Sequence, residues 1–316
     1  MRRIEPLALD DVRAARDRIG ATVLRTPLVK LDVDAQCDIY LKLETLQPIG
    51  SFKLRGAMNA IRMLSPDALS RGVYTASAGN MAQGVAWGAR ALRVPCTVIM
   101  PDGAPRTKLD AAVRLGARVV TLPYEDWWQT LLDHGREGMA GTFIHPVADR
   151  AVIAGNGTVG LEIVEDLPDL AAVLVPFGGG GLAAGIATAV RALAPTAKVY
   201  GCEVATAAPL AAALAAQMPV VVERTVSFVD GIGGRGVLPE MWPLVSALLE
   251  GALVSSLAEV GRAVRLLVER ARIVAEGAGA TPVAAALAGR AGAGKVVCVV
   301  SGGNIDLKTL IQVLCG

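Results

Sequence analysis

The sequence predicts an α/β protein with two open, twisted-sheet lobes that face a shared cleft. Short β-branched runs alternate with Ala-rich amphipathic stretches along the chain. The runs are apolar throughout, which is typical of parallel strands that helices cover on both faces. After His145 the pattern starts again, with glycine-rich turns at the strand ends, and this favours two lobes.

The individual elements follow from these runs and the stretches between them. The expected strands are Val73–Ala76, Cys96–Met100, Ala117–Leu122, Thr142–Ile144, Ala172–Val175, Val199–Glu203 and Lys295–Val300. The expected helices are Asn80–Leu92, Arg106–Leu115, Trp127–Gly138, Leu182–Leu193 and Val260–Ile273. Ligands of such sheets bind beyond the carboxyl ends of the strands, so the turns that follow the strands are where a site is expected.

Composition excludes several classes of protein. Hydrophobic residues make up 53% of the 316 residues, which excludes a disordered chain. The formal charge is 31 − 29 = +2 without a basic block, so we expect no nucleic-acid or membrane partner. No uncharged apolar run reaches transmembrane length, and we expect a cytoplasmic protein. Five widely spaced cysteines without CxxC, and only two histidines, argue against a disulfide framework, a thiolate zinc site or a His-rich metal centre.

Lys53 is the first candidate for chemistry, within the run Gly50-Ser51-Phe52-Lys53-Leu54-Arg55-Gly56-Ala57. A lone lysine is usually a solvated surface residue. This one has apolar neighbours and opens a helix-like stretch, where the helix dipole disfavours a cation. Both effects lower a lysine pKa, which suits imine chemistry. On these grounds alone, a reactive lysine and a surface lysine are about equally supported.

Two loops between a strand and a helix are suited to anions. The first loop, Ser77-Ala78-Gly79-Asn80-Met81, can hold a carboxylate through its N–H groups and the Ser77 hydroxyl. An ordinary helix cap would also place Ser or Asn before the helix, so this motif alone fits either role. Pro176-Phe177-Gly178-Gly179-Gly180-Gly181-Leu182 contains four consecutive glycines whose N–H groups can converge on a phosphate. Neither GxGxxG with an acidic partner nor GxxxxGK[ST] is present, so a dinucleotide fold and a P-loop lose support.

Ser301 follows the expected strand Lys295–Val300 and opens the run Ser301-Gly302-Gly303-Asn304. A hydroxyl at this position can hydrogen-bond a heterocycle nitrogen, whereas the plainer interpretation is a capped turn. Taken together, an imine-capable lysine, a carboxylate loop, a phosphate loop and a partner for a pyridine nitrogen are what a pyridoxal 5'-phosphate site needs.

The ordered set of motifs resembles the fold-type II pyridoxal-phosphate enzymes, the tryptophan synthase β-like kind, with the active site in the cleft. The threonine/serine dehydratase and serine racemase-like branch is the most similar. The resemblance spans nearly the whole chain, and its ordered motifs are together highly specific. They are Thr26-Pro27-Leu28, Leu41-Lys42-Leu43-Glu44, Gly50–Ala57, Ser77–Asn80, Ala154-Gly155-Asn156-Gly157-Thr158, Gly178–Gly181, Gly201-Cys202-Glu203, Asp230-Gly231-Ile232, Glu276-Gly277-Ala278-Gly279-Ala280 and Ser301–Asn304.

The resemblance implies a role for each motif. Lys53 carries the cofactor as a Schiff base and then acts as the base at Cα; with Ser77 and Asn80 it makes up the expected catalytic set. Phe52 packs beside the cofactor ring, and Ser301 contacts the pyridine nitrogen. Asn80 contacts the ring's 3-oxygen, and Glu276 lies near the ring and the substrate. The implied phosphate contacts are Gly178, Gly179, Gly180, Gly181 and Leu182. The implied contacts with the substrate carboxylate are Ser77, Gly79, Asn80 and the Met81 N–H.

The implied activity is elimination of water from a β-hydroxy-α-amino acid, which yields a 2-oxo acid and ammonia. A serine beside the pyridine nitrogen leaves that nitrogen largely unprotonated, so the carbanion is short-lived and loss of a β-hydroxyl competes well with transamination. Racemisation and β-replacement are the alternative activities on this fold. A non-catalytic sensor of a phosphorylated ligand is the alternative outside the enzymes.

Three departures from the family pattern refine this expectation. Serine racemases carry a second serine where Ala78 stands, so racemisation is expected to be poor. Met81 replaces the usual histidine, and Gly233 and Gly234 replace bulkier residues. A softer, roomier pocket would admit a larger β-substituent, such as the phenyl group of phenylserine.

The resemblance also implies a cation site, a domain division and an assembly. Glu203 and the Ala207 carbonyl match the branch's divalent-metal site, but Pro209 replaces an aspartate, so a monovalent cation or none is expected. The expected large cofactor-binding domain comprises residues 1–67 and 148–316. Residues 68–147 form a small mobile domain that carries the carboxylate-binding loop. A homodimer that acts on a small amino acid is the expected assembly.

Overall fold

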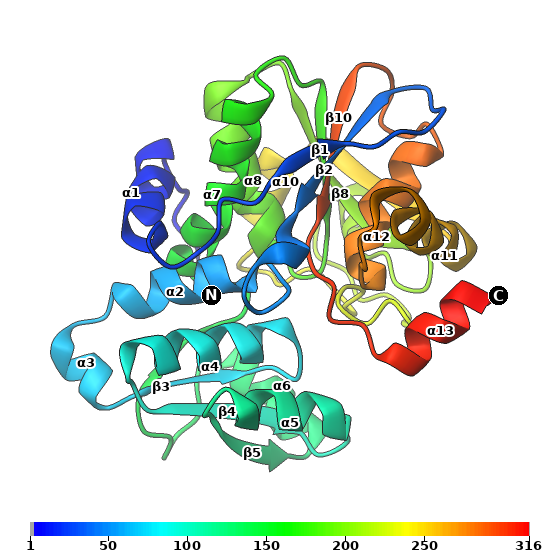
Figure 1. Ribbon diagram of the computed structural model, residues 1–316. Coiled ribbons are helices and arrows are strands. Elements are labelled where there is room, and N and C mark those ends of the chain that lie inside the picture. Colours follow the sequence, from blue (N-terminus) through cyan, green and yellow to red (C-terminus); the bar gives the residue numbers. More distant parts are fainter. Residues whose placement is uncertain (1–2, 316) are drawn as a thin grey trace.

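The computed structural model describes residues 3–315 and contains two separate β-sheets (Figure 1). The larger sheet has the strand order β1-β2-β10-β7-β8-β9 and is parallel except for the antiparallel β1–β2 pair. The smaller sheet, β5-β4-β3-β6, is entirely parallel. We call the six-stranded sheet with its helices the large lobe. The small lobe is the four-stranded sheet with the helices between its strands. The predicted α/β class with two open sheets is confirmed.

The bounds of the elements are as follows. The strands are β1 (Leu28–Lys30), β2 (Asp38–Leu43), β3 (Val73–Ala76), β4 (Cys96–Pro101), β5 (Arg118–Leu122), β6 (Thr142–Phe143), β7 (Ala172–Pro176), β8 (Lys198–Val204), β9 (Gly251–Ser255) and β10 (Lys295–Val300). The helices are α1 (Leu9–Ile19), α2 (Lys53–Arg62), α3 (Pro66–Ser70), α4 (Asn80–Leu92), α5 (Arg106–Arg114), α6 (Tyr124–Leu132), α7 (Arg150–Asp166), α8 (Gly181–Leu193), α9 (Pro209–Ala216), α10 (Trp242–Leu248), α11 (Leu257–Leu266), α12 (Gly277–Leu287) and α13 (Leu307–Cys315). Short turns η1 (Glu44–Leu46, 3₁₀) and η2 (Leu267–Ala271, π) complete the set.

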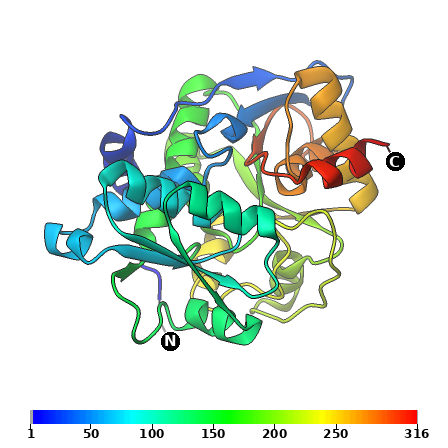
Figure 2. The ribbon, with the colours of Figure 1, turned by 60° about the horizontal axis from the view of Figure 1, so that its bottom comes forward.

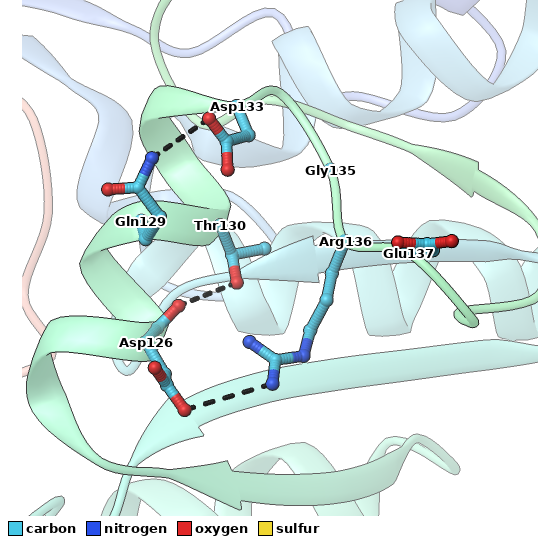
Figure 3. A pocket seen from close by; sticks show the side chains of 7 residues that line it. All are labelled: Asp126, Gln129, Thr130, Asp133, Gly135, Arg136 and Glu137. Carbon is cyan, nitrogen blue, oxygen red and sulfur yellow. Dashed lines mark hydrogen bonds and ion pairs between the residues drawn. The ribbon is translucent and has the colours of Figure 1, made fainter.

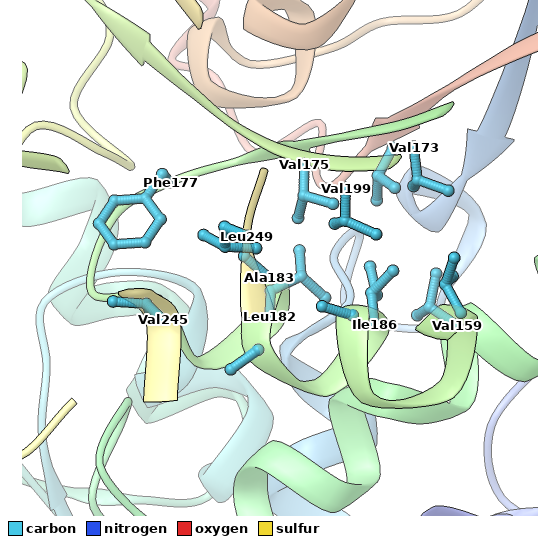
Figure 4. Packing of buried hydrophobic residues seen from close by; sticks show 14 of the residues in the cluster. Val159, Val173, Val175, Phe177, Leu182, Ala183, Ile186, Val199, Val245 and Leu249 are labelled. Carbon is cyan, nitrogen blue, oxygen red and sulfur yellow. The ribbon is translucent and has the colours of Figure 1, made fainter. Parts of the chain in front are cut away.

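The large lobe has three layers, with α7, α8 and α10 on one face of its sheet and α11 and α12 on the other (Figure 1). Figure 4 shows Val173 and Val175 of β7 facing Ala183 and Ile186 of α8. All five residues of β7 are buried, because helices cover both faces of the sheet. This double coverage explains why the strands are apolar throughout instead of alternating.

The small lobe is thinner, and Figure 2 brings it to the front. Helices α4 and α5 pack on one face of its sheet and α6 on the other. The predicted helix Trp127–Gly138 is misplaced, because the structure has α6 at Tyr124–Leu132. His134 (φ 56°) and Gly135 (φ 147°) adopt positive φ values, which a right-handed helix cannot contain. Trp127 and Trp128 are partly buried against the core beneath α6.

Helix α7 was not among the predicted helices, although one of the motifs lies within it. Its run Ala154–Thr158 contains Gly155 and Gly157, which lower helix propensity. These glycines stand where other helices approach closely. A Cβ on Gly155 would lie 2.5 Å from the Arg55 carbonyl oxygen of α2, and one on Gly157 would lie 2.8 Å from the Gly185 oxygen of α8. The motif is therefore a packing surface that lets α7 contact both helices.

The strands of the smaller sheet all fall between Val73 and Phe143, within the segment predicted as the small domain. The domain boundaries and the mobility of that domain stay predictions. Among residues 3–315, no helix combines the length and the apolar character that crossing a membrane requires.

Candidate active site

Helix α2, which Lys53 opens, lies at the junction of the two lobes and packs on both α4 and α7 (Figure 1). Gly84 of α4 permits this approach, because a Cβ there would lie 3.1 Å from the Lys53 carbonyl oxygen. Two residues further along α2, the Arg55 guanidinium is completely buried. It pairs with Glu44 at 2.7 Å and with Glu162 of α7 at 2.6 Å. These bonds fix the helix whose first residue is the candidate reactive lysine.

The Lys53 amine is held in an environment that disfavours its charge. Its Nζ donates a hydrogen bond to the Pro146 carbonyl oxygen at 2.8 Å and lies 5.1 Å from the centre of the Phe52 ring. Desolvation lowers the pKa of Lys53 to about 8, against the opposing pull of the Glu276 carboxylate. This is the direction that the apolar neighbours and the helix start predict, and it leaves a larger neutral, nucleophilic fraction near neutral pH.

The loop before Lys53 is joined to the loop after β10, which brings Ser301 to the site. The Phe52 N–H donates to the Ser301 carbonyl oxygen at 3.0 Å, and the Gly303 N–H donates to the Gly50 oxygen at 2.9 Å. The Asn304 amide also donates to the Ile49 oxygen at 2.8 Å. Two segments about 250 residues apart in the chain therefore form one surface, with a buried Ser301 beside the lysine loop.

The glycine loop between β7 and α8 has the properties of an anion cradle. Gly180 has φ 93°, a conformation that favours glycine, and α8 begins at the next residue. In the described part of the chain, the N–H groups of the loop and the first turn of α8, residues 178–183, have no protein acceptor. Six unpaired donors at the positive end of a 13-residue helix fit a phosphate group. With Lys53, they fit the phosphate and aldehyde ends of pyridoxal 5'-phosphate.

The loop from Ser77 to Asn80 leads into α4 of the small lobe and reaches the large lobe. The Gly79 N–H donates to Ser77 Oγ at 3.2 Å, and a Cβ on Gly79 would meet no atom within 4 Å. The Asn80 amide donates to Glu276 Oε1 at 2.8 Å and accepts from the Asn304 amide at 2.8 Å. The structure therefore brings together Asn80, Glu276 and the Ser301–Asn304 loop, as the predicted site requires.

Glu276 is buried at the start of α12, where several effects act on its carboxyl group. Desolvation raises the pKa of Glu276 to about 7, and the Asp230 carboxylate adds to the rise. The Asn80 bond and Lys108 act in the opposite direction. Lys108 of α5 also forms an ion pair with Asp230 at 2.6 Å, a second contact between the lobes that the sequence did not reveal.

Two residues expected to enlarge the pocket have other roles in the structure. The Met81 side chain is buried in the core between α2, α4 and α7, so it does not soften the pocket. Gly233 has φ 82°, and a Cβ there would lie 3.3 Å from the Ala207 Cβ, so no free space lies beside it. Gly234 is more open, because only the Gly236 oxygen, at 3.8 Å, would neighbour its Cβ.

The predicted cation residues lie at the carboxyl end of β8. The buried Glu203 carboxylate accepts the N–H groups of Leu210 at 2.7 Å and Ala211 at 2.9 Å, at the start of α9. Desolvation raises the pKa of Glu203 to about 7, and these two hydrogen bonds oppose the rise. Ala207 forms an isolated bridge with Val204 and lies close by along the chain. Each carboxylate oxygen has one N–H donor, which leaves a lone pair on each for a further partner.

The structure also groups polar residues that the sequence analysis did not connect. His134 and His145 lie with ring centres 4.4 Å apart, and His134 Nε2 is 2.7 Å from Glu240 Oε1. A cavity of about 310 Å³ lies nearby on the small lobe and is lined mostly by polar residues of α6 and the loop after it (Figure 3). An Asp126–Arg136 contact of 3.8 Å spans it, and none of the predicted site residues lines it. The chemistry predicted from the sequence therefore lies outside this cavity.

Comparison with known proteins identifies the family of the chain. The chain matches the model of the family described as pyridoxal-phosphate dependent enzyme over residues 19–302. It is 41% identical to an L-threonine ammonia-lyase of Geobacter sulfurreducens, covering 96% of this chain and 77% of that protein. Among solved structures, maize serine racemase has a TM-score of 0.89 at 30% identity, covering 98% of this chain and 97% of the other. A T.th. threonine deaminase has a TM-score of 0.84 at 35% identity, covering 95% and 99%. The chain therefore belongs to the pyridoxal-phosphate dependent enzymes, as a lyase of the fold-type II threonine/serine dehydratase branch.

Proposed function

We propose that this enzyme eliminates water from a β-hydroxy-α-amino acid, releasing a 2-oxo acid and ammonia. The observation that carries the proposal is the pairing of Lys53, whose pKa is lowered, with a loop that has no hydroxyl at Ala78. An acid on the face opposite the lysine would return a proton there and invert Cα. Without that acid, elimination is favoured over racemisation. The 41% identity to a threonine ammonia-lyase supports threonine as a substrate.

The residues of the site divide the work between them. Pyridoxal 5'-phosphate, when bound, supplies the electron sink that acidifies the Cα–H bond. The neutral Lys53 amine accepts the Cα proton, as its lowered pKa favours. Ser77, Gly79, Asn80 and the Met81 N–H hold the substrate carboxylate at the positive end of α4. The unpaired N–H groups of the glycine loop would hold the cofactor's phosphate, and the Ser301 hydroxyl would hydrogen-bond its pyridine nitrogen.

The size of the substrate side chain follows from the pocket residues. Met81 is packed in the core and Gly233 is held against Ala207, so two of the three reasons to expect extra space are gone. Gly234 alone supports a larger pocket. We therefore place threonine and serine ahead of bulkier analogues such as phenylserine.

Further parts of the proposal concern the setting of the reaction. We propose a cytoplasmic homodimer in which residues 68–147 move as a small domain. The contacts of Asn80 and Lys108 with the large lobe support closure of that domain over the site. Glu203 and the Ala207 carbonyl support at most a weak monovalent cation site, because Pro209 supplies no side-chain oxygen.

The test is a substrate panel of threonine, serine, phenylserine and hydroxyaspartate, with 2-oxo acid release and the chirality of residual serine as readouts. We expect the highest kcat/KM for threonine or serine, with little D-serine formed. The matched variant Ala78→Ser restores a hydroxyl and should raise racemisation by about 10²-fold, the scale of a general acid. Higher kcat/KM for phenylserine would contradict the proposed pocket size. Efficient D-serine formation by the unmodified enzyme would contradict the proposed reaction.

A further inference from the structure

His145 lies in the segment that links β6 to α7, and its ring accepts hydrogen bonds from the backbone. The N–H groups of Val147 and Ala148 donate to His145 Nδ1 at 3.0 Å and 2.7 Å. Backbone N–H protons are fixed, so Nδ1 must be the unprotonated nitrogen. The ring is therefore neutral, with its proton on Nε2, and it closes residues 145–148 into a turn.

This turn touches both parts of the proposed cofactor site. The Pro146 carbonyl oxygen accepts the Lys53 amine at 2.8 Å. The Val147 side chain lies against the glycine loop, because a Cβ on Gly179 would be only 2.6 Å from its methyl groups. The Val147 oxygen would be 3.0 Å from a Cβ on Gly181. One four-residue turn therefore sets the distance between the lysine and the phosphate-binding N–H groups.

A metal ion is a weaker explanation for the same histidine. Ligand atoms of His134, His145 and Glu240 lie within 4.8 Å of one another. A metal ligand must offer a lone pair, but the Nδ1 lone pair of His145 already accepts two N–H groups and Nε2 carries the proton. His134, paired with Glu240 at 2.7 Å, instead packs against the His145 ring at an interplanar angle of 32°.

We infer that His145 is a positioning residue, whose neutral ring orders the turn that places the Lys53 amine and the glycine loop for cofactor capture. This inference rests on the proposed site but not on the identity of the substrate. It extends the site to a residue that acts on the reacting groups through the Pro146 carbonyl and Val147.

The test is titration of the full-length apoprotein with pyridoxal 5'-phosphate, followed by the visible absorbance of the lysine-bound cofactor. His145→Ala leaves two N–H groups without their acceptor and should raise the apparent Kd by about 10- to 100-fold. In His145→Asn, the amide oxygen can accept the N–H two residues on, as in an Asx turn, and should hold the Kd within about threefold of the unmodified protein. If the alanine variant does not fold, His145→Gln, whose acceptor lies one methylene further out, replaces it.

Asp149→Ala is the matched control, because Asp149 also accepts two backbone N–H groups, those of Ala151 and Val152, only four residues away. It should lower Tm, as the loss of a helix cap does, yet keep the Kd within about twofold. Equal effects of His145→Ala and Asp149→Ala on Kd, or no rescue by asparagine, would overturn the inference. Because the absorbance needs no substrate, a failure here is distinct from a failure of the substrate panel.

Discussion

The two lobes differ in how firmly they hold their share of the site. In the large lobe, α8 is buried from Gly181 to Val190, and β7 is buried along its whole length. In the small lobe, Ala112 is the one buried residue of α5, and β5 is partly exposed. The glycine loop therefore rests on a dense core, whereas the Ser77–Asn80 loop belongs to a thin layer whose polar contacts with the large lobe include those of Asn80 and Lys108.

This difference suits the large lobe to binding the phosphate and the small lobe to closing over the substrate. A phosphate site works best on a rigid support, because its N–H groups must already converge before the ligand arrives. A substrate loop benefits from a lobe that closes over the bound molecule and excludes water. Lys53 lies between the two, on a helix that packs against both lobes.

The largest effect should come from Lys53→Ala, which removes the residue that binds the cofactor and accepts the Cα proton of the substrate. We expect 2-oxo acid release to fall by more than about 10³-fold, since the base at Cα is lost. The absorbance of lysine-bound cofactor should disappear as well. Lys295→Ala, which removes a partly exposed lysine paired with Asp169, is the control and should leave both signals unchanged. Persistence of the absorbance band in Lys53→Ala would refute the assignment.

A smaller effect concerns the pH dependence of cofactor loading and the charge of Glu276, which Asn80 contacts across the lobes. Only the neutral Lys53 amine condenses with the aldehyde, releasing water, and its pKa is lowered to about 8. The rate of cofactor loading should rise by about tenfold per pH unit up to that pKa and level off above it. The Glu276 charge raises the pKa of Lys53, so Glu276→Gln should move the midpoint to lower pH. A midpoint near the ordinary lysine value, or one that Glu276→Gln does not move, would contradict this electrostatic assignment.

The smallest effect comes from comparing two substitutions, Gly180→Ala in the large lobe and Gly79→Ala in the small lobe. Gly180→Ala forces a Cβ into a positive-φ position, 2.8 Å from the nearest Val245 methyl, and should destabilise the protein by about 1–3 kcal/mol. A Cβ on Gly79 meets no atom within 4 Å, so Gly79→Ala should change stability by less than about 0.5 kcal/mol. Its effect should appear as a higher KM, because it stands in the carboxylate loop. Chemical denaturation and steady-state kinetics measure the two quantities, and equal destabilisation by both variants would remove the contrast.

Several elements were predictable from local sequence because local forces decide them. The predicted bounds of β3, α4 and β10 agree with the structure, and each element has a continuous apolar or amphipathic pattern. Strands β1, β2 and β9 were missed, although Ile39, Leu41 and Leu43 of β2 alternate along the strand, and α6 was displaced because two positive-φ residues end it early. Contacts between segments far apart in the chain could not be predicted from the sequence. Asn80 and Glu276 are 196 residues apart, and their hydrogen bond depends on how the lobes pack. His145 had no signal at all, because a backbone turn around a ring nitrogen leaves no spacing pattern.

The contact of Gly84 with the Lys53 carbonyl has a mechanical consequence. Gly84 of α4 meets the first residue of α2 directly through backbone, so the small lobe is joined to the large lobe right beside Lys53. If the small lobe tilts, the carboxylate loop moves about this contact, while Lys53 and the glycine loop stay with the large lobe. Closure would then change the distance from the carboxylate loop to the base and preserve the distance between Lys53 and the phosphate-binding N–H groups.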